Sequence, residues 1–405
     1  MGRGVAVFVA AGSFLACAPA WGSTDSVTPR DRSLARVNHA ALAAAPPASL
    51  RQAPLRWNGS VANAKQQTPK AVHFVLRGSR PKAHLTITPG RLSYLGGRVV
   101  FKISSPHATV CTLSSKPRFW SGPNPTRVKC HGRATVTLPA VDIGLHWTFK
   151  LRARNAKGQS LATRKLVLRA PPFAISSNWS GYVVPSTSPV TQVSGRFTVS
   201  KLNCSHTKNA GVSSWVGIGG AGGSTGDLLQ TGVRSMCIGG VQSENVGWWE
   251  EFPENAETDF ATMSVTPGDS IQASVSQNID GSWTTRVDDL TKGVSGVMNT
   301  GDGYGTQLDS NPGVWLHEEG STAGISYTGG FTAEWIVEQF GTTTGVVIPL
   351  ADFGKVAFSG ATTSLPSWAL TSGEQVGIGD QNGLLWAAPS APDSTGRGFS
   401  VSYTG

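Results

Sequence analysis

The sequence FTAEWIVEQF at residues 331–340 is the stretch that says most about the fold. Alternate side chains of a β-strand point to opposite faces. A strand over this stretch therefore places two acids, Glu334 and Glu338, on one face and apolar side chains on the other, namely Ala333, Trp335 and Val337. If both faces are buried, burial raises the pKa of the acids, and a raised pKa suits a general base. The alternative is a face open to solvent with two hydrated carboxylates.

The strand pattern continues on the N-terminal side of this stretch. Two alternating runs, 271–275 and 283–287, flank Asp280-Gly281, a dipeptide typical of β-hairpin turns. Gly, Ser and Thr are abundant, and no helical pattern with proper caps occurs between residues 173 and 405. A region of this length built almost entirely of strands predicts an all-β fold, either a two-sheet sandwich or a barrel.

A smaller β unit is predicted over residues 83–170. Four short runs alternate there in the strand period: 85–88, 99–103, 134–138 and 147–151. Turn residues at 96–97 and 155–158 separate such runs, and the pattern favours a small immunoglobulin-like sandwich. Residues 23–82 are rich in Ala, Pro, Gln, Arg and Lys, which predicts a basic low-complexity leader or linker.

The first 22 residues have the pattern of a signal peptide. Arg3 precedes an apolar run at 5–16, and Ala18-Pro19-Ala20 is a small-x-small cleavage site. The apolar run is too short to span a bilayer, and no later stretch is long and apolar enough. We therefore expect a secreted protein. Attachment of a lipid at Cys17 is a minor alternative, because Phe14 is atypical for a lipoprotein signal.

Four cysteines remain after this segment, and an even number in an exported chain favours disulfides. The local pairs are Cys111 with Cys130 and Cys204 with Cys237. A zinc site is the alternative, but no Cys-x-x-Cys is present and His131 stands alone beside Cys130. We therefore expect no metal.

Charge divides the chain into two unlike parts. Residues 1–172 hold 26 basic and 3 acidic residues, a net charge of +23, whereas residues 173–405 hold 8 and 21, a net charge of −13. A basic patch can bind nucleic acid or anionic lipid. The marks of export and the lack of a nucleic-acid-binding motif favour another interpretation, in which the basic part covers the acidic part. A permanent module for wall or substrate binding is the rival interpretation.

Residues 173–405 give little support to the familiar hydrolase arrangements. The only histidines there are His206 and His317, and His317-Glu318-Glu319 does not form a His-Glu-x-x-His zinc site. A Ser-His-Asp triad would need one of just these two histidines, and neither Asp-Thr-Gly nor Asp-Ser-Gly occurs. Carboxylate chemistry without a metal remains.

Two further segments place polar groups on strand faces. In the segment 227–233, Gln230 shares a face with Leu228. In the segment 247–253, Trp248, Glu250 and Phe252 align on one face. The alternative for Gln230 is an ordinary polar residue of a strand. The segment 247–253 is either the wall of a cleft with an embedded acid or a row of core residues with exposed acids between them.

Taken together, these segments resemble the glutamic peptidases, also called eqolisins, which are acid endopeptidases. The matching motifs come in family order over roughly residues 176–360: SSNWSG at 176–181, SWVGIGG at 214–220, LQTG at 229–232, WWEEFP at 248–253, VDDLTKG at 287–293 and AEWIVE at 333–338. Each motif alone is weak, whereas six in order are specific. The chain resembles a bacterial-type member with a basic N-terminal extension, since residues 1–172 lie outside the resemblance.

The resemblance implies a sandwich of two curved antiparallel sheets, like a concanavalin or lectin jelly roll, as the catalytic domain over 173–405. It implies that Glu338 and Gln230 are catalytic, with Glu338 as base and then acid and Gln230 as the amide that binds water and the oxyanion. It also implies, more weakly, that other residues line the substrate site: Trp215, Glu250, Ser213 and Trp248. No cofactor is expected, the substrates are proteins or peptides, and we expect a monomer.

Two departures from the fungal pattern stand out. Gly219 and Arg234 occupy places where fungal members carry acids. An arginine near the Gln230 segment would lower the pKa of a neighbouring carboxyl, which bears on pH range and cleavage preference.

A function of another class fits the tryptophans. Trp215, Trp248, Trp249 and Trp335 could form a stacking platform for sugars, as in a secreted carbohydrate-binding sandwich. A glycoside hydrolase is a further alternative, because paired carboxylates also serve that chemistry.

Overall fold

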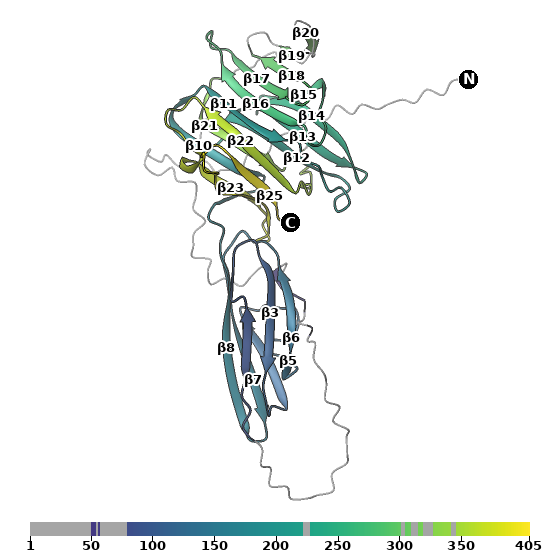
Figure 1. Cartoon of the computed structure of the whole chain (residues 1–405), viewed down its shortest axis with the longest axis vertical. Coiled ribbons are helices and arrows are strands. Elements are labelled where there is room, and N and C mark those ends of the chain that lie inside the picture. Colours follow the sequence, from purple (N-terminus) through teal and green to yellow (C-terminus); the bar gives the residue numbers. More distant parts are fainter. Residues whose placement is uncertain are drawn as a thin grey trace, which may run out of the picture. The chain divides into compact units, whose positions relative to one another are not determined.

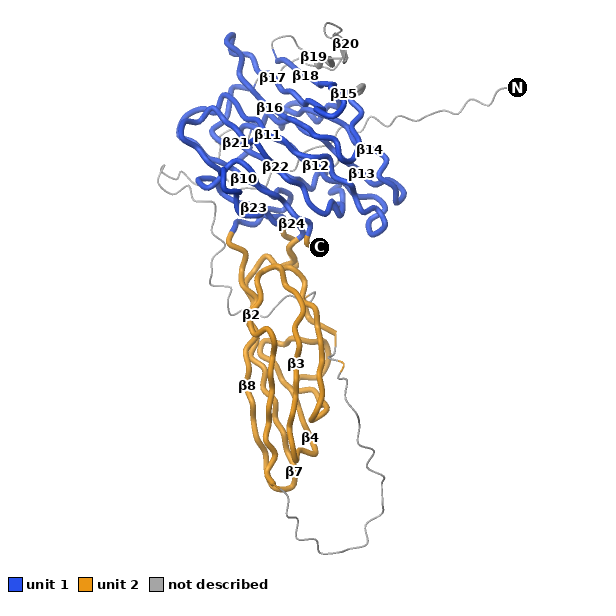
Figure 2. The backbone as a smooth tube through the Cα atoms, viewed as in Figure 1, with its two compact units in different colours: residues 1–36, 173–378, 386–403 blue, residues 37–172, 379–385, 404–405 orange. Residues whose placement is uncertain are grey.

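The computed structural model describes residues 50–53, 56, 79–221, 227–300, 304–308, 315–318, 327–341 and 346–405. The signal peptide, Cys17 and nearly all of the predicted leader lie outside these residues. The chain forms two compact units (Figure 2). Of the described residues, unit 1 contains 173–378 and 386–403, and unit 2 contains those from 50 to 172 together with 379–385 and 404–405. None of the described residues forms a helix long and apolar enough to cross a membrane.

Unit 1 is built almost entirely of β-strands, which pair in two series (Figure 1). The first series, in order of pairing, is β9 (Ala174–Ser176), β23 (Glu374–Gly379), β10 (Trp179–Val190), β21 (Gly330–Glu338), β12 (Ala210–Gly219), β13 (Leu228–Ile238), β14 (Val241–Phe252) and β15 (Asn255–Ser264). All these pairs are antiparallel except the edge pair β23–β9. We call this series the site sheet.

The second series packs behind the site sheet. In order of pairing it is β24 (Leu385–Pro389), β25 (Phe399–Tyr403), β22 (Lys355–Thr363), β11 (Gln192–Thr198), β16 (Ser270–Gln277), β17 (Trp283–Asp289), β18 (Val294–Asn299), β19 (Tyr304–Leu308) and β20 (Trp315–Glu318). The predicted hairpin joins β16 to β17, and Gly281 takes a φ of 88° in its turn, a conformation that favours glycine. A short 3-10 helix, η3, spans Leu370–Ser372.

One large apolar core lies between the two sheets. The site sheet contributes Val216, Trp335 and Val337, and the second sheet contributes Val275 and Phe358. Each side chain in this set is almost fully buried. Burying apolar surface at about 25 cal/mol per Å² is the main stabilising contribution in such a core. The predicted all-β, two-sheet antiparallel sandwich is therefore confirmed.

Unit 2 is a smaller sandwich with its own core. One sheet has the order β1 (His84–Thr88), β3 (Gly97–Ser104) and β6 (His131–Leu138). The other has the order β2 (Arg91–Leu92), β8 (Gly158–Leu168), β7 (Leu145–Asn155), β4 (Val110–Lys116) and β5 (Thr126–Val128). Phe119 packs its ring edge-on against Trp147 and Phe149 in the centre of this core.

Disulfides and one backbone contact join segments that are distant in the sequence. Both predicted disulfides are confirmed, Cys111–Cys130 in unit 2 and Cys204–Cys237 in unit 1, with Cα atoms 5.3 and 5.5 Å apart. Unit 2 also includes the distant segment 379–385, where Leu384 bridges to Val141 and the Leu385 amide donates to the carbonyl oxygen of Ala140.

Candidate active site

The face of the site sheet that points away from the large core carries a second, smaller apolar cluster. This cluster consists of Trp179, Val183, Trp215, Ala221, Leu228, Trp248, Ile336 and Val376. Six polar or charged side chains share the face and are also buried: Ser213, Gln230, Arg234, Glu250, Glu334 and Glu338. Buried polar groups are costly unless they are paired, so a concentration of them marks a candidate functional site.

The two acids of β21 lie where the alternation predicts. Ala333, Trp335 and Val337 face the large core, whereas Ile336 belongs to the smaller cluster. Glu334 is 0% exposed and Glu338 is 2% exposed. The alternative of two hydrated carboxylates is therefore wrong, because both faces of this strand are buried.

Glu338 is held by hydrogen bonds from two neighbouring segments. The indole Nε1–H of Trp215 on β12 donates to Oε2 over 2.7 Å. The side-chain amide of Asn178, directly before β10, donates to Oε1 over 2.9 Å. Each carboxylate oxygen thus has one fixed donor, which orients the side chain towards Trp215.

Burial and hydrogen bonding act in opposite directions on this carboxyl. Burial has the larger effect, and the pKa of Glu338 is raised overall from 4.5 to about 7. Trp215, Trp179 and Asn178 lower it, because their N–H groups favour the charged form. The Trp179 indole acts here without a hydrogen bond of ordinary geometry. Glu338 is therefore poised to exchange a proton near neutral pH in this environment.

Gln230 lies on β13 with a fully buried side chain. Its Nε2 donates to Oε2 of Glu250 on β14 over 2.6 Å. Its Oε1 has no hydrogen-bond partner among the described residues. The carboxamide therefore has one fixed end and one end that can accept a further hydrogen bond.

The strand register arranges the polar groups in two rows across the site sheet. In the first row, which we call the Glu338 row, Glu338 lies opposite Ser213, and Ser213 lies opposite Arg234. In the second row, the Gln230 row, Gln230 lies between Gly217 and Glu250.

Glu334 belongs to the Gln230 row, because it pairs with Gly217. Ser213 and Gly217 are four residues apart on β12, so the rows are separated by about 13 Å along the strands. The structure thus brings Glu338 together with Trp215 and Ser213, and Gln230 together with Glu250, but it does not place Glu338 in contact with Gln230. Ser213 makes a long hydrogen bond of 3.4 Å to the carbonyl oxygen of Val233.

Two glycines make room for Trp215 between the rows. A Cβ on Gly232 would lie 2.6 Å from the Cβ of Trp215, and one on Gly217 would lie 3.0 Å from its ring. Contacts this short force neighbouring atoms to move. The glycines of the Trp-Val-Gly and Gln-Thr-Gly patterns therefore allow β13, Leu228 and Trp215 to pack this closely.

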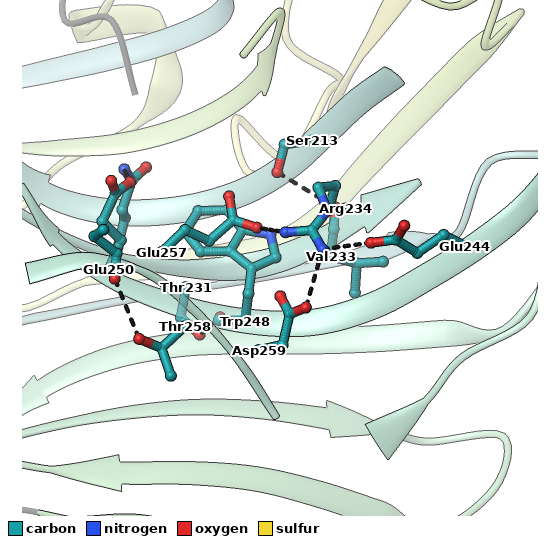
Figure 3. Close-up of polar contacts among 12 residues, drawn as sticks. Ser213, Thr231, Val233, Arg234, Glu244, Trp248, Glu250, Glu257, Thr258 and Asp259 are labelled. Carbon is teal, nitrogen blue, oxygen red and sulfur yellow. Dashed lines mark hydrogen bonds and ion pairs between the residues drawn. The ribbon is translucent and has the colours of Figure 1, made fainter. Parts of the chain in front are cut away.

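Arg234 stands at the end of the Glu338 row and is only 3% exposed. Figure 3 shows its guanidinium pointing at three carboxylates, those of Glu244, Glu257 and Asp259. The Asp259 contact measures 3.0 Å. Arg234 is not among the causes that shift the pKa of Glu338. The expected lowering of a neighbouring carboxyl pKa by this arginine therefore does not extend to Glu338.

The tryptophans do not form a sugar platform. Trp215 and Trp248 belong to the smaller cluster, whereas Trp249 and Trp335 face the large core on the other side of the sheet. All four are at most 2% exposed. A flat surface that stacks on sugar rings needs exposed rings on one face, so the predicted platform is wrong.

Some of the residues that contact Glu338 or Arg234 were not predicted as part of the site. Asn178 and Trp179 belong to a motif that sequence comparison detects, but nothing local shows that both act on Glu338. Glu257 and Asp259 also went unpredicted, because a charged pair on an edge strand is usually solvated. Only the pairing of distant strands reveals these contacts.

The described residues bear on two other kinds of site. Among them, no group of three or more His, Cys, Asp or Glu side chains is arranged to hold a metal ion. A cavity of about 320 Å³ lies on β11, β16 and β22 and is lined by Ser, Gly, Thr, Gln and one arginine. It contains none of the buried acids described above.

Comparison with known proteins identifies the family. Residues 177–395 match the Peptidase A4 family. Aspergillopepsin-2 of Aspergillus niger is 31% identical over 225 residues, which cover 51% of this chain and 68% of the relative. Scytalidopepsin B of Scytalidium lignicola is 32% identical over 148 residues, which cover 35% of this chain and 52% of the relative. A crystal structure of scytalido-glutamic peptidase with a transition-state analogue inhibitor superposes with a TM-score of 0.43 at 24% identity, over 57% of this chain and all of that one. Because the family match spans more than half of the chain, this protein belongs to the Peptidase A4 family and is a peptidase.

Proposed function

We propose that the protein is an acid endopeptidase in which Glu338 is the general base and Gln230 stabilises the oxyanion. The observation that carries this proposal is Glu338 itself, a buried carboxyl with a raised pKa and one fixed donor on each oxygen. A general base needs a fixed geometry, and a raised pKa suits a base that must later return its proton.

The reaction needs only these two side chains and a water molecule. Glu338 takes a proton from water while the water oxygen attacks the peptide carbonyl carbon. A Gln230 N–H donates to the oxyanion that forms. The C–N bond then breaks, and Glu338 returns its proton to the leaving nitrogen, so the products are a carboxylic acid and an amine. A carboxamide does not titrate, so Gln230 can donate a hydrogen bond even in strong acid.

The geometry requires both side chains to lean towards Trp215, because their rows are separated along the strands. Glu338 already does so through its hydrogen bond to the Trp215 indole. The proposed site for the scissile bond is therefore over Trp215, with Ser213, Trp248 and Glu250 around it.

Activity in acid follows if water reaches Glu338 in the working enzyme. Burial alone raises the pKa of this carboxyl, and the three N–H groups lower it. Hydration that keeps those donors therefore lowers the pKa, which lets an acid peptidase use the ionised form at lower pH.

The test is hydrolysis of a denatured protein between pH 2 and 7 by the wild type and by Glu338→Gln, with pepstatin and EDTA present. Cleavage in acid that survives both inhibitors and is lost in the variant supports the proposal. Undiminished cleavage by the variant would move the base elsewhere, with Glu250 the next candidate. A wild type that cleaves nothing at any pH, after loss of residues 1–172, would refute the peptidase mechanism.

We further propose that the protein is secreted and that residues 24–172 act as a pro-segment. The support is the charge difference, +23 before residue 173 and −13 after it. In acid the carboxylates take up protons and the attraction falls. Mass analysis of the secreted product tests this: an N-terminus near residues 170–176 is expected, and a retained unit 2 would contradict removal. Removal would also strip segment 379–385 of its partners in unit 2.

A further inference from the structure

Glu334 is the acid that the proposed reaction leaves unused. It lies on the same strand and the same face as Glu338, four residues earlier, and is 0% exposed. Within the described part of the chain, neither of its carboxyl oxygens has a hydrogen-bond partner. The nearby hydroxyl of Thr332 donates instead to the carbonyl oxygen of Gly219 over 3.0 Å. A buried carboxyl without partners is costly to keep, which calls for an explanation.

The protonation state of this carboxyl follows from its surroundings. Burial raises the pKa of Glu334 well above its usual value, and Thr332 lowers it only in part. Glu334 is therefore a neutral carboxylic acid wherever an acid peptidase works. A neutral carboxylic acid has one O–H donor, which an ionised one lacks.

The register places an acceptor within reach of that donor. Gly217 separates Glu334 from Gln230 in the Gln230 row. Neighbouring strands lie about 4.8 Å apart, so the Cα atoms of Glu334 and Gln230 are roughly 10 Å apart. Gly217 adds no side chain of its own between them, although Leu228 and the Trp215 ring border the space above it, and both the Glu334 and Gln230 side chains are long. The unpartnered Oε1 of Gln230 completes the match.

We propose that Glu334 is a positioning residue: as a neutral acid it donates its O–H across Gly217 to the carboxamide oxygen of Gln230, directly or through one water molecule. Glu250 already accepts one N–H of the same carboxamide. A donor on one side and an acceptor on the other allow only one of the two orientations of the amide. The second N–H then points out of the row, towards the substrate carbonyl.

This inference rests on the proposed role of Gln230 and adds the reason why its amide faces the right way. It also explains why a strand that needs one catalytic acid carries two. Glu338 must lose a proton to act, whereas Glu334 must keep one.

Three variants test the inference. Glu334→Met fills the same space without a donor, and Glu334→Gln restores an N–H donor. Glu374→Met is the matched control, because Glu374 lies in the same row but beyond Val183, on the side away from Gln230. The measurements are kcat, KM and the free energy of unfolding in urea.

Glu334→Met is expected to lower kcat roughly 10- to 100-fold, since a misplaced catalytic group costs rate of this order. Its KM should stay within about twofold of wild type, and its stability should be unchanged or higher, because an unpaired buried carboxyl is replaced by an apolar group. Glu334→Gln should recover most of the lost kcat, and Glu374→Met should match the wild type. A residue with only a structural role would lose stability instead of kcat.

The inference is overturned if Glu334→Met keeps full kcat or if Glu334→Gln is as inactive as Glu334→Met. Its failure is distinct from failure of the proposed function. The proposed function fails if Glu338→Gln stays active, whatever the Glu334 variants do. An inactive Glu338→Gln beside a fully active Glu334→Met removes only the role of Glu334.

Discussion

The Glu338 row and the Gln230 row contain the same kind of residue in opposite electrostatic settings. Glu338 receives hydrogen bonds from Trp215 and Asn178, so its charged form is supported. Glu334 is equally buried and has no donor, so its neutral form is favoured. Hydrogen-bond partners, more than burial, therefore decide which protonation state each acid favours.

Within the Gln230 row, the largest effect is expected from the glutamine itself. Gln230→Met should lower kcat by about 10²–10³, the usual effect of losing one oxyanion donor. Its KM should change little, because the lost hydrogen bond forms mainly in the transition state. Steady-state kinetics on a peptide substrate measures both. A kcat within threefold of wild type would remove Gln230 from the mechanism and with it the function of its row.

The next effect is on the far end of the Glu338 row. Arg234→Met leaves the carboxylates of Glu244, Glu257 and Asp259 without their cation. We expect a loss of about 3 kcal/mol in the free energy of unfolding at pH 7, below the usual cost of breaking a buried pair because two of the acids are partly exposed.

Acid should reduce this loss, since protonated carboxyls no longer repel one another. Urea unfolding at pH 7 and pH 3 provides the measurement. An equal loss at both values would show that Arg234 contributes packing and not charge.

Whether a feature of these rows can be predicted from the sequence depends on how far apart in the chain its residues lie. Alternation in FTAEWIVEQF correctly assigns faces to Glu334, Ile336 and Glu338, because side-chain direction in a strand is a local property. The Asp280-Gly281 hairpin and both disulfides are local in the same sense.

The assignment of Glu334 and Glu338 to different rows is not local. It depends on how β12, β13 and β21 align, and those strands are up to about 120 residues apart in sequence. The donor from Asn178 and the carboxylates around Arg234 come from such pairings too. The family resemblance identifies Glu338 and Gln230 but does not reveal these contacts.

A smaller effect concerns protons on Glu338. Its pKa is about 7 in the folded protein, compared with the ordinary value of 4.5 expected in the unfolded chain. Below pH 4.5 both the folded and unfolded forms are protonated, and above it the unfolded form ionises first. The wild type should therefore lose about 2–3 kcal/mol of stability between pH 4 and 8 through this group.

Glu338→Gln should lack that contribution, whereas Glu334 contributes equally to both proteins and cancels. Urea unfolding of the two proteins at pH 4 and pH 8 tests this. A stability difference that is the same at both pH values would mean that Glu338 does not titrate in this range.

The smallest effect concerns Gly217, the glycine within the Gln230 row. A Cβ at Gly217 would lie 2.9 Å from Leu228 and 3.2 Å from the Cβ of Gln230. Gly217→Ala should therefore cost about 1–2 kcal/mol by overpacking. It should also lower kcat by displacing Gln230, with a roughly tenfold loss as the expected size. Normal kcat in a folded variant would argue against a contact across Gly217.

The most direct test of the account is kcat for Glu338→Gln and Glu334→Gln, measured side by side on one peptide substrate in acid. Both variants make the same chemical change on the same strand face, so they differ only in surroundings. We expect Glu338→Gln to lower kcat by about 10³-fold or more, because it removes the base. We expect Glu334→Gln to lower kcat by less than about tenfold, because it keeps a donor. Equal losses, or a larger loss at Glu334, would contradict it.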